Sequence, residues 1–330
     1  MTQLALYDQI VELLKAARQQ VLRAVNQTMV LTYYEIGRMI VDDEQQGQQR
    51  AAYGKQVLKE LSTKLTQQFG KGFSVDNLEN MRQFYLKYQN TISEKSSRKF
   101  TLTWSHYLKL MRITNEDERS FYEIEAHNNG WSVRELERQY DSALYERLAL
   151  SRDKEGVKEL SAQGQTITTA TDIIKDPYIL EFIGLPESTR YSETDLENAI
   201  INELETFLLE LGKGFTFVGR QVRFTFDEEH FRVDLVFYNR LLRCFVLIDL
   251  KIGKLKHQDL GQMQMYVNYY DRYVKTEDEN KTIGIVLCKD KKDTMVEITL
   301  PEGQNQIFAS KYQTILPSKE ELKQLINKEL

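Results

Sequence analysis

Hydrophobic positions divide the chain into a helical part and a part that contains strands. Over roughly the first 150 residues, apolar side chains recur at helical spacing and no stretch alternates long enough for a strand. The clearest predicted helix ends before Gly70 and carries Val57, Leu58, Leu61, Leu65 and Phe69. Further helices are predicted from Ser74 to about Tyr88, from Trp104 to Met111, and from the capping-box pair Ser132 and Glu135 to about Leu150.

A polar stretch separates this helical part from the rest of the chain. Residues 151–171 lack a clear apolar face, so they predict a linker between an N-terminal domain, residues 1–150, and a C-terminal domain, residues 172–330. Several short helices fit an all-helical nucleic-acid-binding module, including the winged-helix type. They fit a plain helical oligomerisation domain equally well.

The C-terminal domain is expected to begin with an amphipathic helix at residues 194–211 and to continue mainly with strands. The predicted elements that follow are strands at 215–226, 231–238 and 244–252, a helix at 258–270, strands at 282–288 and near Ile307, and a helix capped at Ser318. The order α-β-β-β-α-β predicts a mixed sheet with helices on its faces. The whole chain is therefore expected to be an α+β protein of two domains.

Composition narrows the class of protein. Hydrophobic residues make up 41% and charged residues 28% of the 330, which is typical of a globular protein, and no apolar run reaches the ~18 residues of a membrane span. The start of the chain reads as an amphipathic helix and not as a signal peptide. Cys244 and Cys288 lie far apart and show no metal-ligand spacing. We therefore expect a cytoplasmic protein with no disulfide framework and no membrane partner.

The net charge of −5 excludes a uniformly basic nucleic-acid binder, but one segment is strongly basic. Between Arg82 and Arg112, seven basic residues stand against one acid, Glu94, and six aromatic residues are interleaved with them. Such a segment suits phosphate contact and base stacking, and the candidate nucleic-acid contacts in it are Lys95, Arg98 and Lys99. A solvated basic face above an aromatic core explains the same pattern equally well.

Acidic side chains inside two apolar strands carry the predicted chemistry. Asp234 lies in FRVDLVFYN, and Asp249 and Lys251 lie in CFVLIDLKIG. Because side chains two residues apart share one face of a strand, Asp249 and Lys251 should point the same way, and Asp234 can pair across from them. One ammonium beside two buried carboxylates leaves excess negative charge, which a hard divalent cation such as Mg²⁺ relieves. A cation held there activates a water and polarises a phosphodiester, so the predicted reaction is phosphodiester hydrolysis.

The same residues resemble a known signature. Asp234, followed after fourteen residues by Asp249-Leu250-Lys251, is similar to the D…(D/E)-X-K motif of the PD-(D/E)XK nuclease superfamily. Val233 stands where the name of the superfamily has proline, and Asp249 stands where glutamate is more common. The resemblance implies a restriction-endonuclease-like α/β fold for the C-terminal domain, with the predicted αβββαβ core.

Two further positions extend the resemblance. Gln262 and Tyr266 resemble the Q-x-x-x-Y element of nucleases related to RecB and the lambda-type exonucleases, and Glu197 resembles a helix-borne acid that many superfamily members add to the metal shell. The implied metal is Mg²⁺, with Mn²⁺ able to substitute, and its implied ligand positions are Glu197, Asp234, Asp249 and Leu250. The implied catalytic residues are Asp234, Asp249, Lys251, Gln262 and Tyr266.

Longer stretches are similar to the bacterial YhcG-type nuclease family. They include RVDLVFYNRLLRCFVLIDLKIGKL and GQMQMYVNYYD in the C-terminal half and LTWSHYLKLMRI in the N-terminal half, and the likeness covers nearly the whole chain. The resemblance implies a nuclease whose N-terminal domain binds DNA. RNA as the substrate and assembly into a homo-oligomer both stay open.

Other interpretations of single residues also stay open. The spacing from Thr194 to Glu197 is that of a capping box, so Glu197 is either a helix cap or a metal ligand. Arg220 and Gln221, at the start of a strand, either contact phosphate or lie on the surface. The short acid Asp249 and the acidic net charge are also consistent with an inactive nuclease fold that only binds nucleic acid.

Overall fold

The computed structural model describes residues 3–46, 51–94, 100–150, 154–185, 191–226, 228–316, 318 and 322. The chain forms two compact units, Met1–Glu137 and Arg138–Leu330. The division falls earlier than the expected domain end at residue 150. Helix α7 (Leu144–Leu150) belongs to the second unit because its fully buried Arg147 donates a hydrogen bond of 2.5 Å to Glu210 of that unit. Among the described residues, no helix is both long and apolar enough to cross a membrane.

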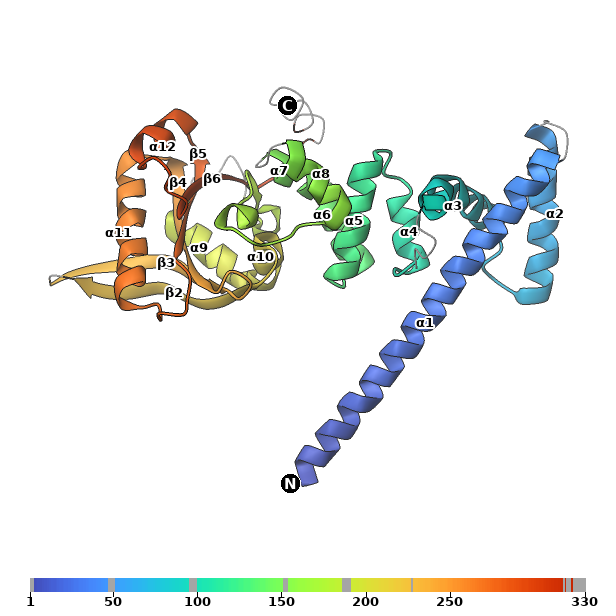
Figure 1. Ribbon diagram of the computed structural model, residues 1–330, viewed down its shortest axis with the longest axis horizontal. Coiled ribbons are helices and arrows are strands. Elements are labelled where there is room, and N and C mark those ends of the chain that lie inside the picture. The colour runs from blue at the N-terminus through green and yellow to red at the C-terminus, as the bar shows by residue number, and fades with distance from the viewer. Residues whose placement is uncertain are drawn as a thin grey trace. The chain divides into compact units, whose positions relative to one another are not determined.

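The first unit consists of helices. They are α1 (Gln3–Gln46), α2 (Ala51–Phe69), α3 (Val75–Glu94), α4 (Trp104–Leu110), α5 (Glu116–Asn128) and α6 (Val133–Asp141), whose last residues pass into the second unit (Figure 1). The described residues of this unit hold no strand, so the part of it that is described has no β-hairpin wing. The all-helical prediction is therefore confirmed, whereas its winged-helix variant finds no support there.

Local sequence signals explain where these helices end. The helix α2 ends at Phe69, and Gly70 follows with a φ of +83°, a left-handed conformation that glycine adopts without strain. Ser132 and Glu135 form the predicted capping box, since each backbone N–H donates to the side chain of the other. The helix that begins there stops at Asp141, before the expected Leu150, because Ala143 has a φ of +53° that a right-handed helix cannot contain.

Aromatic side chains of the basic segment form the core of the first unit. Phe84, Tyr88, Phe100 and Tyr107 are all at most 3% exposed. Their ring centroids lie 4.9 Å apart for the pair Phe84 and Phe100 and 5.4 Å apart for the pair Phe100 and Tyr107. Rings buried against one another in this way present no face to a base. The aromatic-core interpretation is therefore correct for these four residues, and the base-stacking interpretation is wrong for them.

The second unit is built around a six-stranded mixed sheet. After α7 and α8 (Lys154–Gln163) the elements are η1 (Ala170–Ile173), β1 (Tyr178–Ile179), η2 (Glu181–Ile183), α9 (Glu193–Asn202), α10 (Leu204–Leu211), β2 (Phe215–Phe226), β3 (Glu229–Asn239), β4 (Cys244–Lys254), α11 (His257–Tyr273), β5 (Ile283–Asp290), α12 (Asp293–Thr299) and β6 (Ile307–Gln313). The strand order is β1-β6-β5-β4-β3-β2. The meander β2–β3–β4 is antiparallel, whereas β4, β5, β6 and β1 pair in parallel. This is the predicted mixed sheet.

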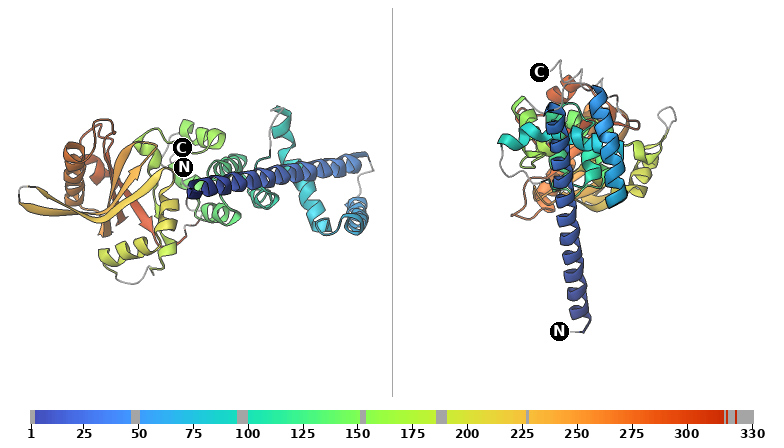
Figure 2. Two further views of the ribbon diagram at one scale, coloured as in Figure 1. Left: turned by 90° about the horizontal axis from the view of Figure 1, so that it is seen from below. Right: turned by 90° about the vertical axis from the view of Figure 1, so that its right-hand side faces the viewer.

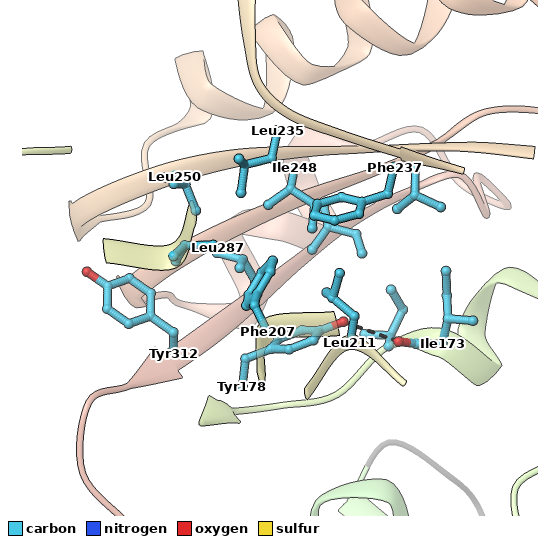
Figure 3. Packing of buried hydrophobic residues seen from close by; sticks show 14 of the residues in the cluster. Ile173, Tyr178, Phe207, Leu211, Leu235, Phe237, Ile248, Leu250, Leu287 and Tyr312 are labelled. Carbon is cyan, nitrogen blue, oxygen red and sulfur yellow. Dashed lines mark hydrogen bonds between the residues drawn. The ribbon is translucent and has the colours of Figure 1, made fainter. Parts of the chain in front are cut away.

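Helices cover both faces of the sheet (Figure 2). On one face α9 and α10 pack through residues such as Leu196, Phe207 and Leu211 against alternate side chains of β3, β4 and β5 (Figure 3). On the other face α11 packs through Leu260, Met263 and Val267. Asp234 and Asp249 lie midway along β3 and β4, between apolar neighbours that belong to these two clusters.

The predicted elements differ from the observed ones at a few places. The strand β2 has the predicted bounds, but the helix expected at 194–211 is two helices, because Glu203 leaves the helical conformation between them with a φ of −112° and a ψ of 33°. The expected linker contains the helix α8, whose Leu160 is fully buried. The helix expected from Ser318 lies almost wholly outside the described residues.

Candidate functional site

The strand β4 places one acid and one base of the predicted motif in direct contact. Asp249 and Lys251 lie two residues apart on this strand, and the Lys251 Nζ is 2.7 Å from the Asp249 Oδ2. Asp249 is only 2% exposed. The alternation of the strand therefore sets both side chains on one face, as the spacing predicts.

Asp234 of β3 lies beside this pair. The last paired residues of the two strands are Leu235 and Ile248, and Asp234 is the next residue beyond them on β3. Its Oδ2 accepts a hydrogen bond of 2.8 Å from the Leu250 N–H of β4. Repulsion from Asp234 also contributes to the raised pKa of Asp249. The two acids thus lie next to each other midway along β3 and β4, where the pairing of the two strands stops.

A glutamine connects Asp234 to a third acid. The Gln221 Nε2 donates to Glu197 at 2.6 Å and to Asp234 at 3.0 Å, so two carboxylates share one amide group. Gln221 has a φ of +49°, an unusual conformation within a strand that turns its side chain toward these acids. Gln221 therefore lies inside the acidic cluster, and its contact with phosphate stays a prediction.

The helix cap expected of Glu197 belongs to other residues. Ser192 is the N-cap of α9, and its capping box is completed by Asp195, whose Oδ2 accepts from the Ser192 N–H at 2.8 Å. The interpretation of Thr194 to Glu197 as a capping box is therefore wrong. Glu197 lies in the second turn of α9, 6% exposed, and points to Gln221.

Burial and mutual repulsion control the charge of this cluster. Burial raises the pKa of Asp249 to about 7, with further increases from Asp234 and Glu193 and a decrease from Lys251. Burial likewise raises the pKa of Glu197, although its hydrogen bond from Gln221 acts in the opposite direction. Burial lowers the pKa of Lys251, but the attraction of Asp249 outweighs it and leaves that pKa raised. Without a cation, the site therefore disfavours the charged form of Asp249 and of Glu197.

The donor set suits a hard divalent cation. All three acids offer carboxylate oxygens, which Mg²⁺ and Mn²⁺ prefer to nitrogen or sulfur ligands. In the described part of the chain, no three His, Cys, Asp or Glu side chains already converge as ligands of one ion, since Gln221 and Lys251 stand between them. The observation in favour of a metal is the buried Asp249 beside the partly buried Asp234, two acids that repel each other and whose charge a cation would neutralise. The backbone N–H of Leu250 donates to Asp234, and the role of Leu250 as a metal ligand stays a prediction.

The two residues of the Q-x-x-x-Y element lie on α11 and contact each other. The Gln262 amide donates to the Tyr266 hydroxyl. Tyr266 is 1% exposed, and burial raises its pKa, with an additional contribution from Asp249. Tyr266 is therefore close enough to feel the charge of the acidic cluster, and it holds Gln262 by a direct hydrogen bond.

The candidate nucleic-acid contacts have different positions. Arg220 is exposed and donates to the Asn198 Oδ1 at 3.0 Å, on the α9 side of the acidic cluster. Lys95, Arg98 and Lys99 lie outside the described residues.

Two features next to the site were not predicted from the sequence. Glu193, in the first turn of α9, raises the pKa of both Asp249 and Lys251 through its charge. A cavity of about 310 Å³ lies between the end of β2 and the outer face of α11, with Phe224, Tyr269 and Tyr273 in its lining. Phe224 also contacts Tyr266, at a centroid distance of 5.6 Å. No sequence motif indicates either feature, because each depends on how α9 and α11 pack on the sheet.

Comparison with known proteins identifies the family of the chain. Residues 171–327 match the family model described as "YhcG PDDEXK nuclease domain", and residues 9–147 match the one described as "DUF1016 N-terminal domain". The chain is 42% identical to "Putative nuclease YhcG" of Escherichia coli (strain K12), over 96% of this chain and 92% of that protein. The chain belongs to the YhcG nuclease family. The resemblance found in the motifs is confirmed, and the mixed sheet is the sheet of a PDDEXK nuclease domain.

Solved structures show weaker likenesses. A repair endonuclease from Pyrococcus abyssi is 17% identical, with a TM-score of 0.27, over 39% of this chain and 50% of its own. The structure titled as an EndoMS-dsDNA2 complex is 16% identical, with a TM-score of 0.27, over 40% of this chain and 49% of its own. The chain thus spans about half the length of these structures, and family membership rests on the sequence matches alone.

Proposed function

We propose that this member of the YhcG family is a divalent-metal-dependent nuclease that hydrolyses phosphodiester bonds in DNA. The observation that carries the proposal is the buried Asp249, with Asp234 beside it, Lys251 on its carboxylate, and a raised pKa. Two repelling acids midway along the interior strands of an apolar sheet do not serve stability, since an apolar pair would cost less free energy. Their retention is explained by a cation and a substrate that need them.

The residues have separate roles in this proposal. Asp234, Asp249 and Glu197 would hold the cation, which supplies Lewis acidity toward a phosphoryl oxygen and a water of lowered pKa. Lys251, fixed by Asp249 at 2.7 Å, stabilises the negative charge that develops on the phosphoryl oxygens. Gln221 holds Glu197 and Asp234 at a constant separation by donating to both.

A substrate panel tests the proposal. The purified chain is incubated with duplex, single-stranded and branched DNA and with RNA, in Mg²⁺, in Mn²⁺ or in a chelator. We expect metal-dependent cleavage of DNA, and a loss of about 10²–10³-fold or more in D234N and K251M. The matched control D141N removes an exposed acid of the same unit, and it should cleave like the unaltered chain.

Three other results would change the assignment. Cleavage of RNA alone would keep the site and replace the substrate. Cleavage that persists unchanged in D234N would show that the acidic cluster is not the active site. Binding of DNA without cleavage, together with no heat of Mg²⁺ binding in calorimetry, would identify an inactive nuclease fold that acts by binding.

A further inference from the structure

The cavity between the end of β2 and α11, called the α11 cavity below, lies outside the acidic cluster. The strand β3 pairs with β4 only from Leu235 onward, and the rest of the hairpin β2–β3 extends past α11 (Figure 1). Side chains of this free part of the hairpin form one wall of the cavity, and side chains of α11 form the other. Its volume of about 310 Å³ is at the small end of ligand sites, so it suits a single planar group and not a folded partner.

Aromatic rings dominate the lining of the α11 cavity. Phe224 stacks on Tyr269 with their centroids 4.1 Å apart and 21° between the ring planes, and Tyr273 lies 5.3 Å from Tyr269. Phe226 is 53% and Tyr273 63% exposed, whereas Phe224 is only 7% exposed. The faces of Phe226 and Tyr273 are therefore open to a ligand. An open aromatic face stacks with another flat ring, and the flat ring that a nucleic acid offers is an unpaired base.

Polar side chains in the same lining favour a nucleotide over an apolar ligand. The Gln264 amide donates to the Asn268 Oδ1 at 3.4 Å, which leaves the Gln264 carbonyl oxygen and the Asn268 amide nitrogen for a ligand. Arg272 is exposed and forms no ion pair within the described part of the chain. Among the described residues that line the cavity, none is acidic. An acceptor, a donor and a cation complement the edge of a base and its phosphate, whereas an apolar ligand would leave them without hydrogen bonds.

One face of α11 leads from the acidic cluster into the α11 cavity. Gln262, Tyr266, Tyr269 and Tyr273 follow one another at intervals of four, three and four residues, which places them on one side of the helix. Phe224 of the cavity contacts Tyr266 at a centroid distance of 5.6 Å. From Tyr266 to Tyr273 the helix rises about 10 Å, which about three nucleotides cover at about 3.4 Å each. A strand bound at the acidic cluster thus reaches the cavity within a few nucleotides.

We propose that the α11 cavity binds an unpaired base of the substrate, a few nucleotides away from the bond that is cleaved. Phe226 and Tyr273 stack on this base, and Arg272 binds a phosphate beside it. The inference rests on the proposed nuclease function and adds a requirement to it. The substrate has to present a single-stranded or unpaired nucleotide at this position, because a continuous duplex has no free base to enter the cavity.

Binding of short single-stranded DNA to the full chain in a chelator tests the cavity without cleavage. We expect F226A/Y273A to weaken binding about 5- to 150-fold, the effect of losing one stacked base. The matched control V218A/I298A removes two side chains of the second unit that are 51% and 81% exposed and lie outside the cavity, and it should bind like the unaltered chain. All four positions are exposed, so far-ultraviolet circular dichroism should not change.

An abasic nucleotide, moved stepwise along the DNA, locates the bound base. The unaltered chain should lose affinity at one position only, and F226A/Y273A should lose none there, because both changes remove the same contact. With metal present, this position should lie within about three nucleotides of the cleaved bond. R272Q should reduce the slope of log affinity against log salt by about 0.7, whereas R240Q, which changes an exposed arginine outside the cavity, should not.

Several results would overturn the inference. They are unchanged binding by F226A/Y273A, an abasic scan without a sensitive position, and equal weakening toward a fully paired duplex, which would show that the rings contact no base. The nuclease proposal fails separately. Binding that depends on Phe226 and Tyr273 in a chain that cleaves nothing would keep the base site and remove the nuclease, whereas cleavage of single strands that F226A/Y273A leaves unchanged would do the reverse.

Discussion

Replacing Asp249 with asparagine should stabilise the second unit, and more strongly at pH 8 than at pH 5. Burial and repulsion raise the pKa of this acid from 3.8 to about 7. The folded chain therefore favours the neutral form, and the Asp249 contribution to stability is largest below pH 3.8 and is lost as the pH rises toward 7. Above pH 7 the penalty is constant.

The raised pKa of Asp249 gives the size of the expected stability change. One pKa unit corresponds to about 1.4 kcal/mol. The raised pKa therefore destabilises the folded unit by about 4 kcal/mol at pH 8 and by about 1.5 kcal/mol at pH 5. Asparagine keeps the shape and removes the charge, and the loss of the attraction of Lys251 is already included in the raised pKa of Asp249, so the remaining cost is only the difference between asparagine and the neutral acid, which is the same at both pH values. The difference in the stability gain between pH 8 and pH 5, about 2.5 kcal/mol, is free of that cost.

Urea unfolding in a chelator measures this difference. Circular dichroism follows both units, whereas tryptophan fluorescence follows the first unit, because Trp104 and Trp131, the two tryptophans of the chain, both lie in it. The fluorescence transition thus serves as an internal reference that D249N should not move. The exposed control D141N should change the free energy of unfolding by less than about 0.5 kcal/mol at either pH.

One result would refute the reasoning. If D249N changes the stability of the second unit equally at pH 5 and pH 8, Asp249 does not bear the burial penalty on which the proposed cation site depends. A loss of cleavage in the same variant would then show only that the residue is needed, without explaining why.

Three further predictions concern other contacts. Q221L removes the donor shared by two carboxylates, so the metal concentration for half-maximal cleavage should rise about 10–100-fold, and an unchanged value would exclude a positioning role. R147M should destabilise the second unit by about 3–5 kcal/mol in urea unfolding, because the buried Glu210 loses its nearest ion-pair partner and keeps only the more distant Arg138, and R147M/E210M should recover much of this loss. G37A should lower the stability of the first unit by about 1–3 kcal/mol, since an added Cβ would lie 2.1 Å from the Met81 carbonyl oxygen. Urea unfolding followed by tryptophan fluorescence measures this loss, and an unshifted transition would contradict the α1–α3 packing.

Much of the sheet and of the site could be predicted because both depend on local spacing. Alternation along a strand fixes which side chains share a face, so Asp249 and Lys251 had to lie together once β4 formed. The position of Asp234 followed from the short turn between β3 and β4, which fixes how the two strands pair. The tyrosine and glutamine of α11 meet because they are four residues apart on one helix.

Contacts between distant segments could not be predicted in the same way. Nothing in the residues around Gln221 indicates that it joins Glu197 to Asp234, since this requires a positive φ within β2 and the packing of α9 beside it. The two-residue strand β1 has no pattern of its own and exists because it pairs with β6. The cap of α9 was placed two residues too late, because several polar residues there have suitable spacing and only the backbone selects Ser192.

The sequence by itself determined the family, the helical and mixed-sheet parts, and the acids and lysine of the motif, because these depend on residue types at short and regular separations. The tertiary structure decided which acids share a donor, which aromatic residues are buried and which stay exposed. These properties depend on the free energy of packing between segments far apart in the chain, and periodicity along the sequence carries no record of that packing.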